Sequence, residues 1–384
     1  MRKTVLISGI VSLVVLVGLG ILFLVNQQKK TISVTKEVTV PASPTQAPEV
    51  TSEAERITVL AQHLDTPWAL TFLPDTSLFV TERKGTVWHI PTDWSFSPRM
   101  IATLPSVKEI GEGGLLGITL HPDFENNKYV YLYYTYNSTG DETRNRVVRT
   151  TYQNNRLEDE TIILDAIPGA PNHNGGRIAF GPDGFLYITT GDAQEPSQAQ
   201  NTKTLGGKIL RITDTGEPAL GNPFDNEIYS YGHRNAQGIT WDTNGNLWAT
   251  EHGRSGLQSG FDELNRIEEG DNYGWPVIQG DETRPGMVTP VANSGAITTW
   301  APGGITSLNG SLYFTGLRGK SLYKVTFQAD EPTVTEYLVN EFGRIREVIA
   351  GPDGLLYITT SNRDGRGTPT ADDDKIIRVN PGKL

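Results

Sequence analysis

The sequence contains no cysteine and no run of lysine or arginine. Without cysteine the chain forms no disulfide, no cysteine-ligated zinc site and no thiol nucleophile. The formal net charge is −11 over 384 residues, so the chain lacks the basic surface that binds phosphate backbones. These absences exclude thiol chemistry and argue against nucleic acid as a partner.

Short motifs of several enzyme classes are also missing. The sequence has neither the H-E-x-x-H pattern of zinc proteases nor the G-x-S-x-G turn of serine hydrolases. The stretch GEGGLLGITLHP (111–122) lacks the Gly-Lys-Ser/Thr ending of a phosphate-binding loop. From residue 57 onwards there is no long segment with 3.6-residue periodicity, which argues against a helical fold.

One long apolar run is present, at the N-terminus. Residues 4–25 carry no charge, and a helix of this length would span about 33 Å, enough for a bilayer core. We predict an N-terminal membrane anchor within residues 1–30, with the rest of the chain extracytoplasmic. Cleavage of the run as a signal, which would secrete the rest, is the alternative. Residues 31–56, rich in Pro, Ser and Thr, predict a flexible linker.

A repeat runs through the remainder of the chain. Its unit is a short apolar strand, a turn with Asp, Asn or Pro, and a second apolar strand. Six turns recur at intervals of 44 to 65 residues, at Asp75, Asp123, Asp183, Asn244, Asn309 and Asp353. Such spacing predicts an all-β, six-bladed β-propeller over residues 57–384. The last strand, 374–380, is expected to pair with the first blade and close the ring.

The repeat also predicts where a functional site lies. Equivalent positions of the blades should surround one mouth of the channel. Residues about ten positions before each turn are Asp65, Glu112, His173, Arg234, Trp300 and Arg344. A histidine at such a mouth can act as a general base, although a lone loop histidine is the simpler interpretation. The glycines after His173 let the backbone turn sharply or come close to a ligand.

Arginines are the second feature of this predicted mouth. Arg234 and Asn235 share one segment, Arg344 and Arg346 lie two residues apart, and Arg318 follows a second strand. Arginine binds carboxylates bidentately, so the set predicts a ligand with several negative groups. Surface salt bridges are the alternative for each of them.

The segment 251–276 combines acids, glycines and backbone bends. Carboxylates and carbonyls at turns suit calcium, which takes several oxygen ligands. The pattern is not an EF-hand, and a long solvated loop explains it equally well.

Taken together, these motifs resemble the glucose/sorbosone dehydrogenase family, the soluble quinoprotein aldose dehydrogenases. The resemblance is collinear from about residue 57 to 380 and is carried by TPWALTFLPD, GEGGLLGITLHPDF, HNGGRIAFGPDG, GGKILRI, IYSYGHRNAQGI, DELNRI, NYGWP, WAPGG and GRIREVIAGPDG. It implies a six-bladed propeller that binds pyrroloquinoline quinone (PQQ) and calcium and oxidises aldoses at C1. Electrons would leave to a membrane quinone or another redox carrier.

The resemblance also implies roles for single residues. His173 matches the general base, and the carbonyls of Gly253 and Arg254 match the ligands of a catalytic calcium. Glu263 and the Tyr273 carbonyl match a second, structural calcium. Asn172 and Trp300 would face the sugar, with Trp300 as a stacking platform. The glycines after His173 would give clearance to a planar cofactor and a sugar. Residues that would contact PQQ are Glu112, Arg234, Asn235, Arg318, Arg344 and Arg346.

Two positions depart from the family's pattern. Glu112 stands where relatives usually have glutamine, and an added carboxylate should repel an anionic cofactor unless it is protonated or paired with arginine. Asn172 stands where the best-known glucose dehydrogenases have aspartate, which should leave the base less basic. Two other functions stay open: a calcium-dependent sugar lactonase, and a non-catalytic propeller that binds glycans.

Overall fold

The computed structural model describes residues 54–91, 98–140, 142–256 and 259–384. These residues belong to one compact unit, Ala47–Leu384. The predicted anchor (1–30) and most of the predicted linker lie outside the described residues. Among the residues that are described, no helix is both long and apolar enough to cross a bilayer.

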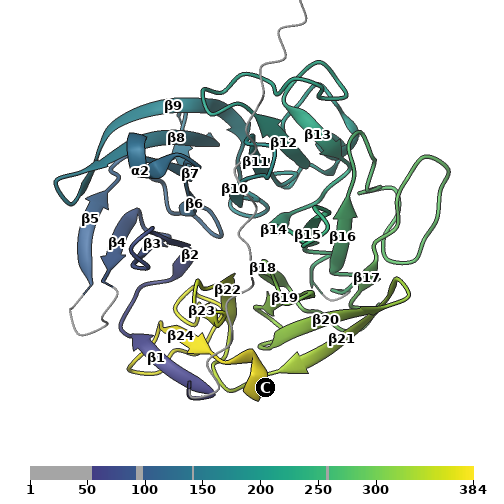
Figure 1. The fold of residues 1–384 in the computed structure, drawn as a ribbon. Coiled ribbons are helices and arrows are strands. Elements are labelled where there is room, and N and C mark those ends of the chain that lie inside the picture. Colours follow the sequence, from purple (N-terminus) through teal and green to yellow (C-terminus); the bar gives the residue numbers. More distant parts are fainter. Residues whose placement is uncertain (1–53, 92–97, 141, 257–258) are drawn as a thin grey trace, which may run out of the picture. The chain divides into compact units, whose positions relative to one another are not determined.

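Six four-stranded antiparallel sheets surround a common axis, which confirms the predicted six-bladed propeller (Figure 1). Each blade takes four strands that are neighbours in the sheet. In sheet order, the blades are β2–β5 (Pro67–Phe72, Leu78–Glu82, Thr86–Ile90, Arg99–Thr103), β6–β9 (Leu115–Leu120, Tyr129–Asn137, Thr143–Gln153, Arg156–Pro168), β10–β13 (Ile178–Phe180, Leu186–Thr189, Lys208–Ile212, Ile228–Tyr231), β14–β17 (Ala236–Trp241, Leu247–Glu251, Glu263–Ile267, Ala292–Asn293), β18–β21 (Pro302–Leu308, Ser311–Gly316, Leu322–Gln328, Glu331–Tyr337) and β22–β24 (Ile345–Ala350, Leu356–Thr360, Ile376–Val379) with β1 (Ile57–Ala61).

The ring closes differently from the sequence prediction. Strand β24 does not join the first blade; it lies beside β23 in the sixth blade and takes β1 as its outer neighbour. Ile57 pairs with Val379, and Val59 pairs with Ile377. The N-terminal strand thereby covers the edge that β24 would otherwise expose, which joins the two ends of the propeller.

The six predicted turns each connect the first and second strands of a blade. Asp183 shows why an acid recurs there: its Oδ1 accepts a hydrogen bond from the Phe185 amide at 3.2 Å, and its Oδ2 accepts one from the Tyr187 hydroxyl at 2.9 Å. Asp353 makes the same contacts with the Leu355 amide and the Tyr357 hydroxyl. Each carboxylate therefore closes its turn within its own blade.

The second strand of each blade is buried on both faces because neighbouring blades cover it. All residues of β3, β11, β15, β19 and β23 are buried. This explains why the sequence shows continuous apolar runs there rather than strict alternation. Each buried Leu or Ile contributes roughly 1.5–3 kcal/mol to folding.

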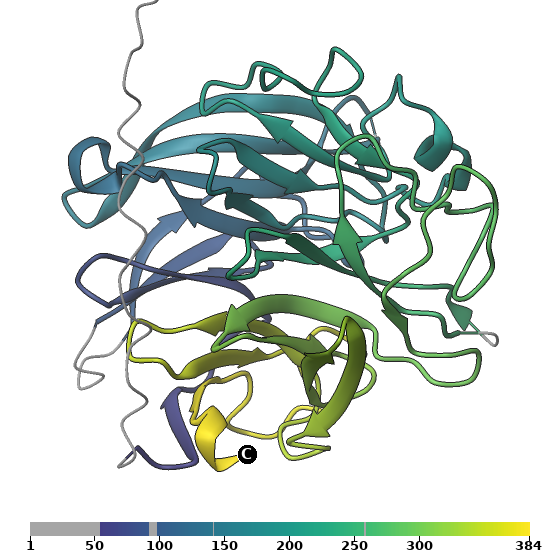
Figure 2. The ribbon, with the colours of Figure 1, turned by 45° about the vertical axis from the view of Figure 1, so that its right-hand side comes forward.

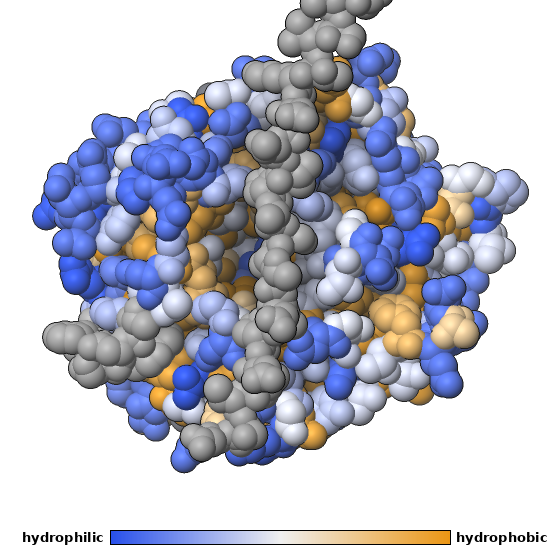
Figure 3. Space-filling view, viewed as in Figure 1, coloured by the Kyte–Doolittle hydropathy of each residue, from blue (hydrophilic) through white to orange (hydrophobic). Residues whose placement is uncertain are grey.

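Polar residues dominate the rim of the face in Figure 3, and apolar ones lie further in, between the blades. The connection between β16 and β17, residues 268–291, projects from the body of the propeller in Figures 1 and 2. Helical elements are short: α2 (Phe124–Asn127) and the 3₁₀ turns η1 (Pro196–Gln200) and η3 (Pro381–Lys383).

Candidate active site

A cavity of about 440 Å³ lies at the end of the propeller opposite the six turns. Its walls come from segments that precede the first strand or follow the second strand of a blade, so several blades contribute. Nine residues predicted from the sequence line it: Glu112, Asn172, His173, Arg234, Gly253, Arg254, Arg318, Arg344 and Arg346. The repeat therefore brings together side chains that are far apart along the chain.

The histidine of this cavity has a carboxylate partner. His173 Nδ1 lies 2.8 Å from Asp192 Oδ1, and the side chain of Asp192 is fully buried. Asp192 Oδ2 accepts a hydrogen bond from the Trp275 indole at 2.9 Å. Because a carboxylate can only accept here, the proton sits on Nδ1 and Nε2 is the basic nitrogen. Asp192 was not predicted; its signal is the acid that ends the TTGD run after β11.

Asn172, which stands in place of an aspartate beside the base, directs its hydrogen bonds to other residues than His173. Its backbone amide donates to Gln194 Oε1 at 3.1 Å, and its Oδ1 accepts from Arg366 at 2.8 Å. The carboxylate that is missing at position 172 is supplied by Asp192 instead. The substitution therefore does not leave His173 without an acidic partner.

The glycines after His173 correct another expectation. A Cβ on Gly175 would lie 2.5 Å from the Thr189 carbonyl oxygen, and one on Gly176 would lie 2.6 Å from the Leu116 side chain. Both residues have positive φ, at 62° and 104°. They give room to the protein's own strands, not to a cofactor or a sugar.

Three arginines form a buried cationic floor: Arg234, Arg344 and Arg346, which are 5%, 7% and 5% exposed. Arg344 binds Asp364 Oδ2 through Nε and Nη2 at 2.9 and 2.7 Å. The Nε groups of Arg234 and Arg346 are buried without a hydrogen-bond partner in the described part of the chain. Burial lowers the pKa of Arg346 to about 9. Buried donors left open in this way indicate a place for an anionic ligand.

The cavity lining as a whole carries more positive than negative side chains. Six arginines line the cavity against two carboxylates, Glu112 and Asp262, in a chain whose net charge is −11. Arg318 lies on the exposed rim, where it donates to Ser259 Oγ at 2.8 Å. The predicted set of arginines therefore gathers at one cavity and does not scatter over surface salt bridges.

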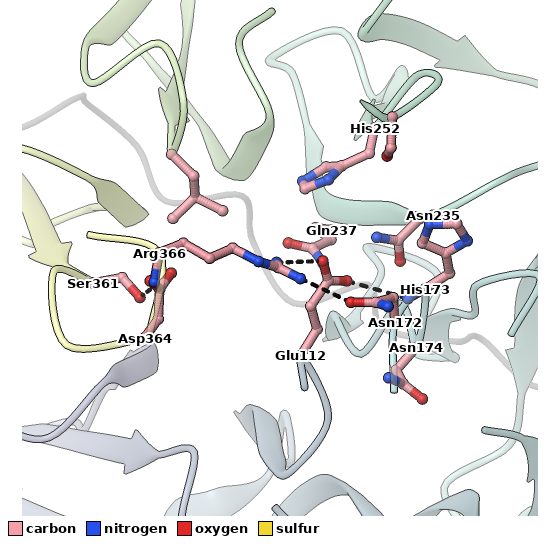
Figure 4. A network of polar contacts seen from close by, with 12 residues as sticks. Glu112, Asn172, His173, Asn174, Asn235, Gln237, His252, Ser361, Asp364 and Arg366 are labelled. Atoms are coloured by element: carbon pink, nitrogen blue, oxygen red, sulfur yellow. Dashed lines mark hydrogen bonds and ion pairs between the residues drawn. The ribbon is translucent and has the colours of Figure 1, made fainter. Parts of the chain in front are cut away.

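Glu112 is paired rather than protonated. Arg366 donates to its Oε1 at 2.6 Å, and the His173 amide donates to its Oε2 at 3.1 Å (Figure 4). Burial by itself would raise its pKa, but the charges of His252 and Arg366 and these hydrogen bonds together lower it to about 2. Because burial lowers the pKa of His252 to about 4, the cation that faces Glu112 at neutral pH is Arg366.

His252, Gln237 and Arg366 also line the cavity and were not predicted. His252 Nε2 lies 2.8 Å from the Pro302 carbonyl oxygen, and Gln237 Oε1 accepts from Arg346. Gln237 follows the recognised HRN segment by two residues, so an alternation argument could have found it. The other two lie in segments of variable length that follow second strands.

The segment predicted to bind a catalytic calcium forms one wall. Asp262 organises it: Oδ1 accepts from the Gly253 amide at 2.9 Å, and Oδ2 accepts from the Trp300 and Ala301 amides at 2.7 and 2.9 Å. The described residues contain no group of three or more His, Cys, Asp or Glu that could hold a metal. A calcium ion at Gly253 and Arg254 would thus rest on backbone carbonyls.

Five predicted residues lie outside the lining: Asn235, Glu263, Tyr273, Trp300 and Asp65. Asn235 is buried just behind it, with Oδ1 accepting from the Gly175 amide at 2.9 Å. Glu263 and Tyr273 lie within the fourth blade and the following loop. Burial first, and then the neighbouring Glu251, raise the pKa of Glu263 to about 8, so a cation beside this carboxyl would relieve the penalty of its burial.

Trp300 packs into the core, with its ring 5.1 Å from Phe314 and 5.6 Å from Tyr323. Its neighbours Thr299 and Ala301 line the cavity instead. The structure therefore gives no support to a sugar platform at Trp300. Asp65, the sixth predicted residue of the mouth, pairs with Lys84 at 3.1 Å and is also outside the lining.

Relatives of the chain share this architecture. The aldose sugar dehydrogenase YliI of Escherichia coli strain K12 is 32% identical, over 85% of this chain and 92% of the relative. The quinoprotein glucose dehydrogenase B of Acinetobacter calcoaceticus is 34% identical, over 63% of this chain and 56% of the relative. The PQQ-bound structure of an aldose sugar dehydrogenase from Streptomyces coelicolor is 39% identical, with a TM-score of 0.79 over 86% of this chain and 99% of that one.

The sequence profile of the glucose/sorbosone dehydrogenases matches residues 64–377, which is most of the propeller. This match and the predicted motifs agree on the same segments, from TPWALTFLPD in the first blade to GRIREVIAGPDG in the sixth. The protein belongs to the glucose/sorbosone dehydrogenase family.

Proposed function

We propose that the protein is a PQQ-dependent aldose sugar dehydrogenase that oxidises the C1 hydroxyl of a sugar to the lactone. Family membership makes it an oxidoreductase that acts on the CH–OH group of aldoses. The observation that carries the proposal is a buried floor of arginines, two with open Nε groups, beside a histidine–aspartate pair. A quinone with three carboxylates fits that floor.

The cofactor would be held by Arg234, Arg344 and Arg346 from below and by Arg318 from the rim, with Asn235 behind them. Charge-assisted hydrogen bonds from buried arginines are the strongest contacts available to carboxylates. When bound, PQQ supplies the two-electron acceptor for the hydride that leaves C1.

The chain itself handles the proton. Nε2 of His173 accepts the proton of the C1 hydroxyl, because Nδ1 is already committed to Asp192. The buried carboxylate then stabilises the imidazolium, and Trp275 fixes the carboxylate in place. Loss of a proton from oxygen and a hydride from carbon leaves a carbonyl at C1, which is the lactone of a cyclic aldose.

Calcium is the second proposed component. The carbonyls of Gly253 and Arg254 offer hard oxygen ligands at the cavity wall, on a segment that Asp262 holds in place. A structural calcium beside Glu263 and the Tyr273 carbonyl is supported by the carboxyl of Glu263, whose pKa is raised by burial and by the neighbouring Glu251 although Asn265 donates to it at 3.1 Å.

Tethering of the propeller to the outer side of a membrane is proposed from residues 4–25 alone. In that location a membrane quinone or another redox carrier would accept the electrons.

The proposal is tested by dye reduction. The full-length chain, loaded with PQQ and calcium, should reduce an artificial electron acceptor when aldoses are added, and the cofactor-free chain should not. Hydrolysis of a sugar lactone without cofactor would instead favour a lactonase. Sugar binding that survives His173→Gln, with no dye reduction by the parent protein, would favour a glycan-binding propeller.

A further inference from the structure

We propose that Arg366 is a specificity-determining residue that bars the mouth of the cavity and restricts the substrate to unextended, neutral monosaccharides. The inference rests on the proposed function, and it concerns a residue outside the motifs that identify the family. It stands on the contacts of Arg366, on its position and on the charge of its partners.

Arg366 reaches from the sixth blade to two other blades. It follows β23, and its Nη1 donates to Glu112 ahead of the second blade at 2.6 Å. Its Nη2 donates to Asn172 ahead of the third blade at 2.8 Å. Figure 4 shows the side chain extending across the centre of the site to these two partners. A single guanidinium thus links three blades at the mouth.

Asp364 holds the backbone of Arg366 in place. Asp364 Oδ1 accepts from the Arg366 amide at 2.9 Å, while Oδ2 of the same carboxylate binds the guanidinium of Arg344. The segment that carries Arg366 is therefore connected through Asp364 to Arg344 of the cavity floor. Such support reduces the conformational entropy lost when the long side chain is held in one position.

The position of Arg366 indicates that it contacts the sugar and not the cofactor. The floor arginines are buried, whereas the side chain of Arg366 is 51% exposed. Glu112 accepts a hydrogen bond from the backbone amide of His173, so Arg366, its partner, lies directly beside the base. A sugar whose C1 hydroxyl reaches His173 must lie next to Arg366, and a second sugar unit attached to it would meet the guanidinium.

Charge defines the class of sugar. Glu112 and Arg366 neutralise each other, so this pair presents no net charge to a substrate. Three N–H groups of the guanidinium remain for hydroxyl oxygens, and the carboxylate can accept hydroxyl protons. An acidic sugar would gain from Arg366 but would be repelled by Glu112 at close range.

The test compares D-glucose with maltose, its 4-linked disaccharide, as probes for the PQQ-loaded full-length chain. Arg366→Ala should raise the ratio of kcat/KM for maltose to that for glucose about tenfold. It should raise KM for glucose about fivefold and change kcat by less than about twofold, because the base and the floor are untouched. These values are measured at saturating PQQ, since Arg366→Ala also leaves Glu112 without its partner beside the anionic cofactor. Arg366→Lys keeps the charge but not the contact with both Glu112 and Asn172. Its kcat/KM ratio and its KM should lie between those of the parent protein and of Arg366→Ala.

A matched control is Arg56→Gln. It removes an exposed arginine of the same type, paired with Glu341 at 2.6 Å outside the cavity lining, and should change none of these values. Melting temperatures of all variants exclude unfolding as the cause. An unchanged maltose-to-glucose ratio and an unchanged KM in Arg366→Ala would overturn the proposal.

Saturation-transfer NMR on the cofactor-free chain separates this proposal from the proposed function. Glucose should give stronger transfer than maltose in the parent protein, and the difference should disappear in Arg366→Ala. Equal transfer from glucose and maltose in both proteins contradicts the proposed role of Arg366, whether or not the parent protein binds PQQ. Failure of the parent protein to bind PQQ contradicts the proposed function. The role of Arg366 is then tested by the NMR comparison alone.

Discussion

The two ends of the propeller use the same repeat in opposite ways. At the turn end, the carboxylates of the turns between first and second strands bond within their own blade: Asp183 bonds to Tyr187, and Asp242 bonds to the Trp248 indole at 2.9 Å. At the cavity end, polar contacts cross between blades. Arg366 binds Glu112 and Asn172, and Arg346 binds Gln237.

Among the described residues, the buried groups without a hydrogen-bond partner differ in charge: on β4 of the first blade they are the Trp88 indole and Nδ1 of His89, which lies near the turn end. At the cavity end, Arg234 and Arg346 keep buried Nε groups without a partner in the described chain. Local contacts at the turn end thus stabilise each blade by itself. Convergent contacts at the cavity end leave unused hydrogen-bonding capacity, which is what a ligand site needs. Substitutions at the two ends should therefore separate stability from activity.

The largest effect is expected at His173. Replacement by Gln removes the base, and kcat should fall about 10²- to 10⁴-fold while PQQ binding persists. His121 is the matched control, because it lies at the turn end with its Nε2 3.5 Å from Asp214 Oδ2. Steady-state kinetics should show no loss for His121→Gln. Equal losses in both variants would mean that the two ends do not differ in function.

The next effect is expected at Asp192. Asp192→Asn keeps the shape of the side chain but removes the charge that fixes the tautomer and stabilises the imidazolium. We expect kcat to fall roughly 100-fold with little change in KM. Asp214→Asn serves as the control at the turn end. A kcat for Asp192→Asn within twofold of the parent would contradict the assigned role.

A smaller effect separates the buried floor from the exposed rim. Arg346→Met should weaken PQQ binding about 10- to 100-fold, because a desolvated charge-assisted contact is lost. Arg318→Met should weaken it about threefold or less, since solvent screens the rim. Isothermal titration calorimetry measures both. The reverse order would place the cofactor's carboxylates at the rim.

The smallest effect on activity is expected at the turn end. Tyr187→Phe removes the hydroxyl that binds Asp183 and should lower the free energy of unfolding by about 1 kcal/mol. Its kcat/KM should equal that of the parent protein. Denaturant unfolding and kinetics on the same preparation check the two statements, and a loss of activity without loss of stability would contradict them.

Much of the fold could be predicted because the repeat is local. An apolar strand, an acid at the turn and a second apolar strand are readable within about twenty residues, so the number of blades followed from the sequence. The closure by β1 was not predicted correctly, because the pairing of Ile57 with Val379 leaves no local signal. The predicted anchor at residues 1–30 stays a prediction.

The candidate site was predictable where a fixed offset from the turn applied, as for Glu112, His173, Arg234 and Arg344. The same offset failed at Trp300, whose ring packs against the core residues Phe314 and Tyr323. Asp192 and Arg366 were missed because they follow second strands in loops of variable length. Their roles depend on contacts across the cavity, which only the assembled ring reveals.

The central claim is that the buried arginines at the cavity end form a binding site for PQQ. Spectral titration of the full-length chain with PQQ, in the presence of calcium, tests it most directly. We predict a saturable change in the absorbance of the cofactor with one equivalent per chain, and a clearly weaker titration for Arg346→Met. No saturable change in the parent protein, or an identical curve for the variant, would contradict the account.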